Sequence, residues 1–172
     1  MYGSAKSRVQ LQKQDSSHKL PRMPLTDDQR QAIKVSYAKL AENPTKYGNE
    51  LFIRLFADFP DYKDIWPRFR AIPDSSIVGS DQLRTHATVY MKGLGTIVSK
   101  IENEEELQDI IKKIAQAHIK FNISRSHVEH MAPSLLAVLK NANGSIDPGT
   151  KEAWEAFFEI FGDVLVQLTK GR

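Results

Sequence analysis

Two histidines of this chain occur among apolar residues at helical spacing. The first set is Leu83, His86, Tyr90, Leu94, Ile97 and Ile101, and the second is Leu107, Ile111, Ile114, His118 and Phe121. Steps of three and four keep each set on one helix face. Both imidazoles are therefore predicted to face the core. A buried imidazole needs a partner for its ring nitrogens, and the neutral ring is a common metal ligand.

The two histidines are also spaced to meet. His86 lies 15 residues before Ile101, and His118 lies 14 residues after Glu104. At the helical rise, each is about 21–22 Å from the connecting turn, so a hairpin brings them to the same level. Closely packed helices lie about 8–10 Å apart, which leaves no room for a large flat cofactor. The two helices are therefore predicted to diverge as a V that holds a group between the rings.

The chemistry of this pair favours a cofactor over a bare ion. Zinc takes three or four protein ligands, and no Cys, Asp or Glu accompanies the histidines on their faces. Haem leaves one or two axial positions for protein ligands, and its apolar face suits a neighbourhood rich in aromatic rings. The alternative is two hydrogen-bonded core histidines beneath ordinary core aromatics. His127 and His130, three residues apart, are expected on a solvated helix face, with metal binding as the alternative.

The composition sets wider limits. The 172 residues suit one domain, with or without a tail, and 41% are hydrophobic and 26% charged. No apolar run approaches the roughly 18 residues of a membrane span, and no signal-peptide core is present, so the expected location is cytoplasmic. The chain has no cysteine, which excludes disulfides, thiolate ligands and covalent haem attachment.

The net charge of +3 is unevenly distributed. Residues 1–23 carry five basic residues and one acidic residue, so the rest of the chain is near neutral. This basic, Ser- and Gln-rich stretch is predicted to be a disordered extension that precedes one domain over residues 24–172. A solubilising tail and an arm for an acidic partner or membrane surface are both open. Nucleic-acid recognition is not expected, because the folded part lacks positive charge.

Helical patterns follow one another after Pro24. They cover residues 25–43, 43–60, 80–101, 104–120, 124–144 and 147–168, with a short aromatic segment after Pro60 and a loop over 71–80. Thr26 is the expected N-cap of the first, and Asp147–Thr150 caps the last. Ser126 and Glu129 are spaced as a capping box, and Pro133 predicts a kink or a later helix start. The predicted fold class is all-α, with six to eight helices.

These motifs resemble the globins from about Leu25 to Lys170. The segment YGNELFIRLFADFP is similar to the globin second helix and the corner after it, with Gly48 at the close helix crossing. LRTHATVYMKGLGTIV resembles the distal helix, IAQAHIKFNI the proximal helix and EAWEAFFEIFGDVLV the last helix. The resemblance implies a globin fold around a non-covalent haem b, with His118 as proximal iron ligand and His86 as distal residue.

The resemblance also assigns the surroundings of the haem. Ile123 is expected to pack on the haem, Phe161 to lie beneath it, and Arg68 to meet a propionate through a charge-assisted bond. An ordinary surface role is the alternative for Arg68. The complete expected haem-binding set is Phe52, Phe56, Trp66, Arg68, Phe69, Tyr90, Leu94, Ile114, Ile123 and Phe161.

Three residues depart from the globin pattern. Trp66 stands where globins almost always have Phe, Tyr90 replaces a small aliphatic residue near the distal histidine, and Phe52 replaces the Tyr of very oxygen-avid globins. The indole shifts the haem edge, Tyr90 narrows the ligand side, and Phe52 removes a hydrogen-bond donor to bound oxygen. A crowded pocket favours internal ligation by His86.

The resemblance therefore favours a bis-histidyl, hexacoordinate globin. Its expected role is redox or gas (O2 or NO) sensing and signalling, or electron transfer to an unidentified partner, rather than bulk O2 delivery. The alternative is reversible O2 storage on a pentacoordinate haem. Diatomic gases (O2, CO and NO) are the expected ligands. Enzymatic function is not expected beyond a minor redox side activity, and a haem-free interaction module is disfavoured by the presence of both histidines.

Overall fold

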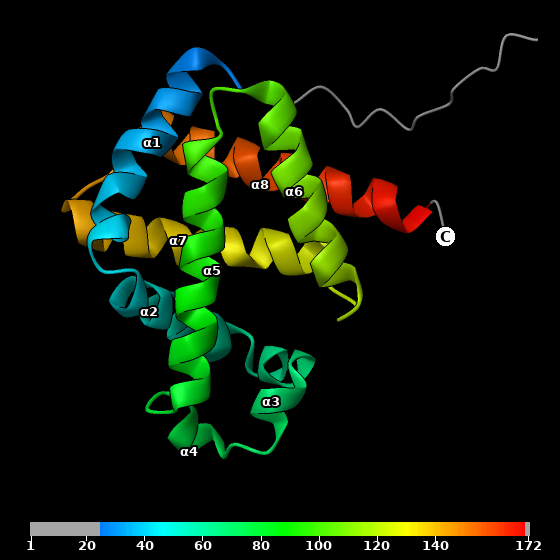
Figure 1. The fold of residues 1–172 in the computed structure, drawn as a ribbon. Coiled ribbons are helices and arrows are strands. Elements are labelled where there is room, and N and C mark those ends of the chain that lie inside the picture. The colour runs from blue at the N-terminus through cyan, green and yellow to red at the C-terminus, as the bar shows by residue number, and fades with distance from the viewer. Residues whose placement is uncertain (1–24, 171–172) are drawn as a thin grey trace, which may run out of the picture.

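The structure is a computed structural model that describes residues 25–170, and the predicted basic extension over residues 1–23 lies outside them. The described residues form eight α-helices and one 3-10 helix, without a strand, which confirms the all-α prediction (Figure 1). The elements are α1 (Asp27–Glu42), α2 (Pro44–Asp58), η1 (Pro60–Ile65), α3 (Pro67–Arg70), α4 (Asp74–Ile77), α5 (Asp81–Ser99), α6 (Glu104–Ile119), α7 (Arg125–Asn143) and α8 (Pro148–Lys170). No helix within this range is long and apolar enough to cross a membrane.

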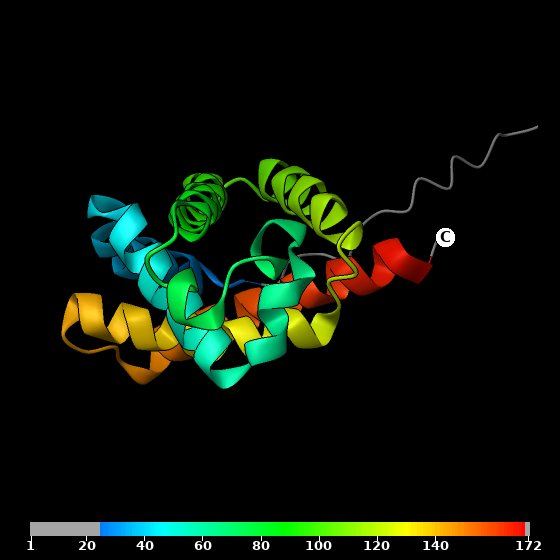
Figure 2. The same cartoon turned by 90° about the horizontal axis from the view of Figure 1, so that it is seen from below.

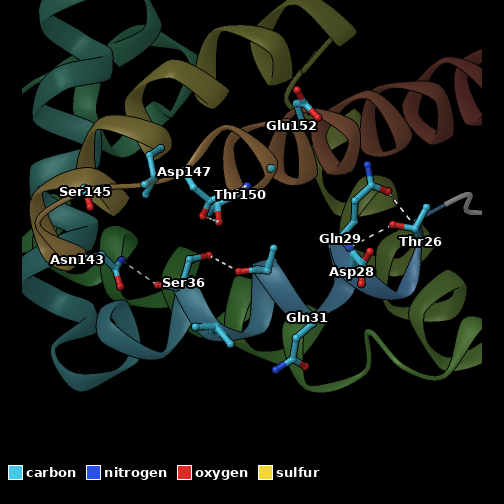
Figure 3. Close-up of a pocket in the computed structure, with 14 residues that line it drawn as sticks. Thr26, Asp28, Gln29, Gln31, Ser36, Asn143, Ser145, Asp147, Thr150 and Glu152 are labelled. Atoms are coloured by element: carbon cyan, nitrogen blue, oxygen red, sulfur yellow. Dashed lines mark hydrogen bonds between the residues drawn. The ribbon is translucent and has the colours of Figure 1, made fainter.

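Helix α1 begins at the predicted residue and is hydrogen-bonded to α7 and α8. Thr26 Oγ1 accepts a hydrogen bond from Gln29 N, and the Gln29 side chain accepts from Thr26 N. Further along α1, Ser36 Oγ accepts from the buried indole Nε1 of Trp154 at 2.9 Å. Asn143 Nδ2 donates to the Ser36 carbonyl at 3.1 Å (Figure 3). These bonds join α1 to α8 and to the last residue of α7.

Helices α2 and α5 cross so closely at Gly48 that no side chain larger than a hydrogen atom fits between them. An added Cβ on Gly48 would lie 2.6 Å from the carbonyl oxygen of Ala87. Only glycine fits at this point, and Thr45 and Thr88 share a hydrogen bond beside it at 2.9 Å. His86 immediately precedes Ala87, so the crossing sets the position of the first histidine.

Helices α5 and α6 form the predicted V. They are joined by a short turn at the top of Figure 1 and separate downward, while α7 and α8 pass behind them. Seen from below, the open end of the V faces the segment that contains η1 and α3 (Figure 2).

Two local predictions are wrong, and one of the two alternatives predicted for Pro133 is excluded. The predicted loop over 71–80 contains the one-turn helix α4, with Ile77 buried. Helix α7 begins at Arg125 and runs on through Pro133, so the proline does not displace its start. The capping residues are Ser124 and His127, whose Nδ1 accepts from Ser124 N at 3.1 Å, rather than Ser126 and Glu129.

Candidate functional site

A cavity of about 420 Å³ lies inside the V, within the size range of small-molecule sites. Helices α5 and α6 provide two of its walls, and α2, η1, α7 and α8, with Trp66 and Ile123 from the connecting segments, contribute the rest. Both His86 and His118 line it. Seven of the ten predicted haem-binding residues line it too: Phe52, Trp66, Tyr90, Leu94, Ile114, Ile123 and Phe161. The arrangement offers two imidazoles to one apolar space.

The orientation of His118 is fixed by its own helix. Its Nδ1 lies 2.8 Å from the carbonyl oxygen of Ile114, one turn earlier. A carbonyl accepts only, so Nδ1 carries the proton and Nε2 keeps its lone pair for a ligand. The Phe161 ring meets the imidazole edge-on, with 6.0 Å between ring centroids. The backbone thereby selects the tautomer, and Phe161 limits rotation of the ring.

An aromatic cage holds the ring of His86. Phe52 and Trp66 both lie 4.9 Å from it, between ring centroids, and Phe69 lies 5.5 Å from it. Burial, followed by the positive charge of Arg68 and the proximity of His118, lowers the pKa of His86 to about 4. The imidazole is therefore neutral near pH 7, and one ring nitrogen has a free lone pair.

The remaining predicted residues lie outside the cavity wall. Phe69 is fully buried behind His86, and Phe56 packs against Phe52, Trp66 and Phe69. Arg68 is exposed, yet its charge acts on His86. The aromatic residues thus support the cavity from behind rather than lining it.

Some lining residues were not predicted from the sequence. They include Tyr62, Thr96, Lys113, His127, Phe157 and Phe158. Lys113 precedes Ile114 on α6, and an exposed cation at the edge of an apolar cavity suits the carboxylates of a ligand. The helical period contained this signal, because Ile110, Lys113 and Ala117 follow at steps of three and four.

The prediction for the second histidine pair is wrong. His127 and His130 are partly buried rather than on a solvated face. The His130 ring is stacked on Phe59 at 4.1 Å, and the His127 ring lies 4.7 Å from Tyr62. Among residues 25–170, no group of three or more His, Cys, Asp or Glu side chains is placed to hold a metal ion.

A family model described as Globin matches residues 49–165. The chain belongs to the globin family. Cytoglobin-1 of Oryzias latipes is 31% identical over 121 residues, which are 69% of this chain and 68% of the relative. The globin of Nerita albicilla is 23% identical over 82% of this chain and 90% of its own.

Solved globin structures share the fold of this globin. Aplysia limacina myoglobin matches with a TM-score of 0.78 at 20% identity, over 84% of this chain and 98% of the myoglobin. The hexa-coordinate haemoglobin of Drosophila melanogaster matches with a TM-score of 0.71 at 23% identity, over 81% and 92% of the two chains. At these identities the similarity shows the fold alone.

Family membership implies an iron haem as cofactor, and the residues present fit it. The cavity lining is largely apolar, as the macrocycle requires. Two imidazoles without a further metal-binding cluster within 25–170 suit an iron whose other ligands come from a porphyrin. The lone pair on Nε2 of His118 and the neutral ring of His86 would suit binding to the iron of such a group.

A second, polar groove of about 640 Å³ lies between α1 and the turn before α8 (Figure 3). Its side chains serve the helix ends. Asp147 accepts hydrogen bonds from the hydroxyl of Thr150 at 2.6 Å and from its backbone N–H at 2.9 Å. The hydroxyl bond, and then the backbone bond, lower the pKa of Asp147. The groove has no imidazole or aromatic side chain in its lining, so it does not compete as a haem site.

Proposed function

We propose that this globin binds haem b non-covalently between His118, as proximal ligand, and His86, as distal ligand to the same iron. Its proposed role is redox or gas sensing and signalling, or electron transfer, rather than bulk O2 delivery. The observation that carries the proposal is that two imidazoles, of His86 on α5 and His118 on α6, line one largely apolar cavity. The hexa-coordinate haemoglobin of Drosophila melanogaster, which has the same fold, supports this choice.

The haem supplies an iron that exchanges electrons and binds diatomic gases. The chain supplies the rest. His118 offers the lone pair of Nε2 to the iron. The hydrogen bond from Nδ1 to the Ile114 carbonyl makes Nε2 more basic and so a stronger metal ligand. The apolar wall excludes water and lowers the local dielectric, which tunes the redox potential. Arg68 and Lys113 are the cations proposed to meet the propionates.

Ligation by His86 makes gas binding conditional. With His86 bound to the iron, an external ligand such as CO, NO or O2 would bind only in the fraction of molecules in which His86 is displaced, so the apparent affinity for that ligand would be lower. The cage of Phe52, Trp66 and Phe69 keeps the ring near its bound position. A globin built this way responds to gas or redox state better than it stores oxygen.

Absorption and electron paramagnetic resonance spectra of the haem-loaded protein test the proposal. Wild type is expected to be low-spin in the ferric and ferrous states. His118→Ala is expected to lose most haem affinity, whereas His86→Ala keeps haem, becomes high-spin and binds CO faster. His127→Gln is the matched control, because His127 also lines the cavity but is assigned no role as a ligand.

Other outcomes identify other functions. A high-spin wild type with a stable oxygenated spectrum in air would support the alternative, reversible O2 storage on a pentacoordinate haem. A ferric spectrum that does not change in His86→Ala would remove His86 as an iron ligand. A protein that develops no Soret band with haemin would contradict the haem-binding function itself.

A further inference from the structure

A second group of aromatic and imidazole rings connects the haem cavity with the side of α7. Tyr62, from η1, lines the cavity together with His127. The Tyr62 hydroxyl is hydrogen-bonded to Nδ1 of His130. His130 is in turn stacked on Phe59, with 4.1 Å between ring centroids and an interplanar angle of 9°. Phe59, Tyr62 of η1 and the two histidines of α7 thus form one packed unit beside the cavity.

The bond between Tyr62 and His130 is unusual within this molecule. Among residues 25–170, Tyr62 is the one tyrosine whose hydroxyl is bonded to an imidazole, and the hydroxyl of Tyr37 donates to the Met91 carbonyl instead. A carbonyl accepts a hydrogen bond but does not take up a proton near neutral pH, whereas imidazole does both. His130 is therefore a base already in contact with the phenol.

This contact matters for the oxidation of a phenol. A tyrosine that loses an electron becomes a strong acid and must release its proton. With a base already hydrogen-bonded, the electron and the proton leave together and no charged phenol forms. The stack on Phe59 holds the His130 ring in place, and His127 packs on the Tyr62 ring with 4.7 Å between ring centroids. Nδ1 of His130 is thus held in position to accept the proton of the Tyr62 hydroxyl.

We propose that Tyr62 is a redox-active residue that donates an electron to the haem when a hydroperoxide reacts there, with His130 as the acceptor of its proton. The proposal rests on haem binding in the cavity but not on whether His86 ligates the iron. Tyr62 would thus pass an electron to the haem, and the oxidised site would move from the haem to a side chain of this protein.

The reaction is balanced by an external reductant of the phenol class. Hydrogen peroxide breaks its O–O bond, takes up two electrons and two protons, and leaves as two water molecules. Tyr62 supplies one electron, its O–H proton moves to Nδ1 of His130, and a neutral phenoxyl faces an imidazolium. One donor phenol supplies the second electron and a proton. Another returns a hydrogen atom to the phenoxyl, after which His130 releases its proton, so two phenols are oxidised per peroxide.

Two other oxidisable residues line the same cavity. Tyr90 is partly buried, and burial raises the pKa of its hydroxyl. Trp66 packs among Phe52, Phe69 and the ring of His86. No hydrogen bond joins the Tyr90 hydroxyl to a base among the described residues, so its oxidation would leave the proton without an acceptor. The hydrogen-bonded imidazole therefore favours Tyr62.

The test uses haem-loaded wild type and variants mixed with hydrogen peroxide and frozen at once. Electron paramagnetic resonance is expected to detect a phenoxyl radical that Tyr62→Phe loses and Tyr90→Phe retains. A spin trap followed by peptide mass spectrometry is expected to label Tyr62. His130→Phe keeps a ring on Phe59 but removes the acceptor, so the radical yield falls. The remaining signal moves to the g value of a phenoxyl without a hydrogen bond, a change that lost packing alone does not produce.

His127→Gln is the matched control, because His127 touches Tyr62 without accepting its hydrogen bond. All variants are compared at equal Soret absorbance, which separates a failure to bind haem from a failure of this proposal. A radical on Tyr90 or Trp66, or an unchanged signal in Tyr62→Phe, would overturn the assignment of Tyr62. A signal that His130→Phe leaves unaltered in yield and g value would overturn the role of His130.

Discussion

Replacing Gly48 with alanine tests whether the α2–α5 crossing positions the distal side of the haem site. The new Cβ would lie 2.6 Å from the Ala87 carbonyl oxygen and 2.9 Å from Met91 Cγ. Met91 is a flexible side chain and can move, but Ala87 presents backbone. Restoring an ordinary contact of about 3.5 Å requires the helices to separate locally by roughly 0.9 Å.

The expected loss in the free energy of unfolding of Gly48→Ala is the difference between two opposing effects. Forcing a methyl group into a packed contact costs about 1–3 kcal/mol. Alanine recovers about 0.5–1 kcal/mol over glycine inside a helix. Because the close contact is with backbone, which cannot move easily, the cost of the methyl group is expected in the upper part of its range. After the gain from alanine is subtracted, the free energy of unfolding is expected to fall by about 1–2 kcal/mol. For a chain of this size that lowers Tm by roughly 2–8 °C.

Denaturant unfolding and the ferric absorption spectrum of the haem-loaded protein measure both consequences. Because His86 immediately precedes Ala87, a displaced α5 is expected to raise the high-spin fraction as well as to lower stability. Gly79→Ala is the matched control, since an added Cβ there meets no atom within 4 Å. If Gly48→Ala matched the control in both stability and spin state, the crossing would not position His86.

Two further changes probe the proximal wall and a helix end. Phe161→Ala removes a buried ring beside His118 and is expected to cost about 3–5 kcal/mol in denaturant unfolding and to speed haem loss to a scavenger protein. A loss below about 1 kcal/mol would contradict that role. Asp147→Asn keeps the shape of the α8 cap but removes its charge. The folded-state pKa of Asp147 is lowered, so its charge stabilises the fold above the unfolded value of about 3.9, and the advantage over the variant disappears as pH falls through the folded pKa. A difference that stays constant on acidification would refute the assignment.

Helix positions were largely predictable because burial follows the period of 3.6 residues. Helix α5, predicted over 80–101, spans Asp81–Ser99, and helix α6, predicted over 104–120, spans Glu104–Ile119. Local chemistry fixed the ends as well, since Asn103 accepts from the N–H groups of Glu105 and Glu106. These signals lie within a few residues of each boundary, where a sequence pattern is informative.

The capping error at α7 has a chemical cause. The pattern for a capping box looks for Glu or Gln three residues after Ser or Thr, and Ser126 with Glu129 satisfies it. In the structure, the Nδ1 of His127 performs the same function for Ser124, because an imidazole nitrogen also accepts from a backbone N–H. A pattern written for carboxylates and amides does not include this residue type.

The surroundings of His127 and His130 were not predictable for a different reason. Their ring partners, Tyr62 and Phe59, lie far away in the chain and on another element. Periodicity places a residue on a helix face, but it does not say which segment covers that face. The same limit applies to Phe56 and Phe69, which have the aromatic character of a haem pocket yet pack behind it.

The two sides of the cavity are held by unrelated means, and this has a consequence for function. His118 is oriented within its own helix, by the bond from Nδ1 to the Ile114 carbonyl. His86 depends on tertiary contacts, namely the Gly48 crossing and the rings of Phe52 and Trp66. Loosening tertiary packing is therefore expected to displace the imidazole of His86 while that of His118 keeps its geometry. If both histidines bind the iron as proposed, His86 would leave it more readily than His118 and the haem would stay bound, which is the property that the proposed gas- or redox-responsive role requires.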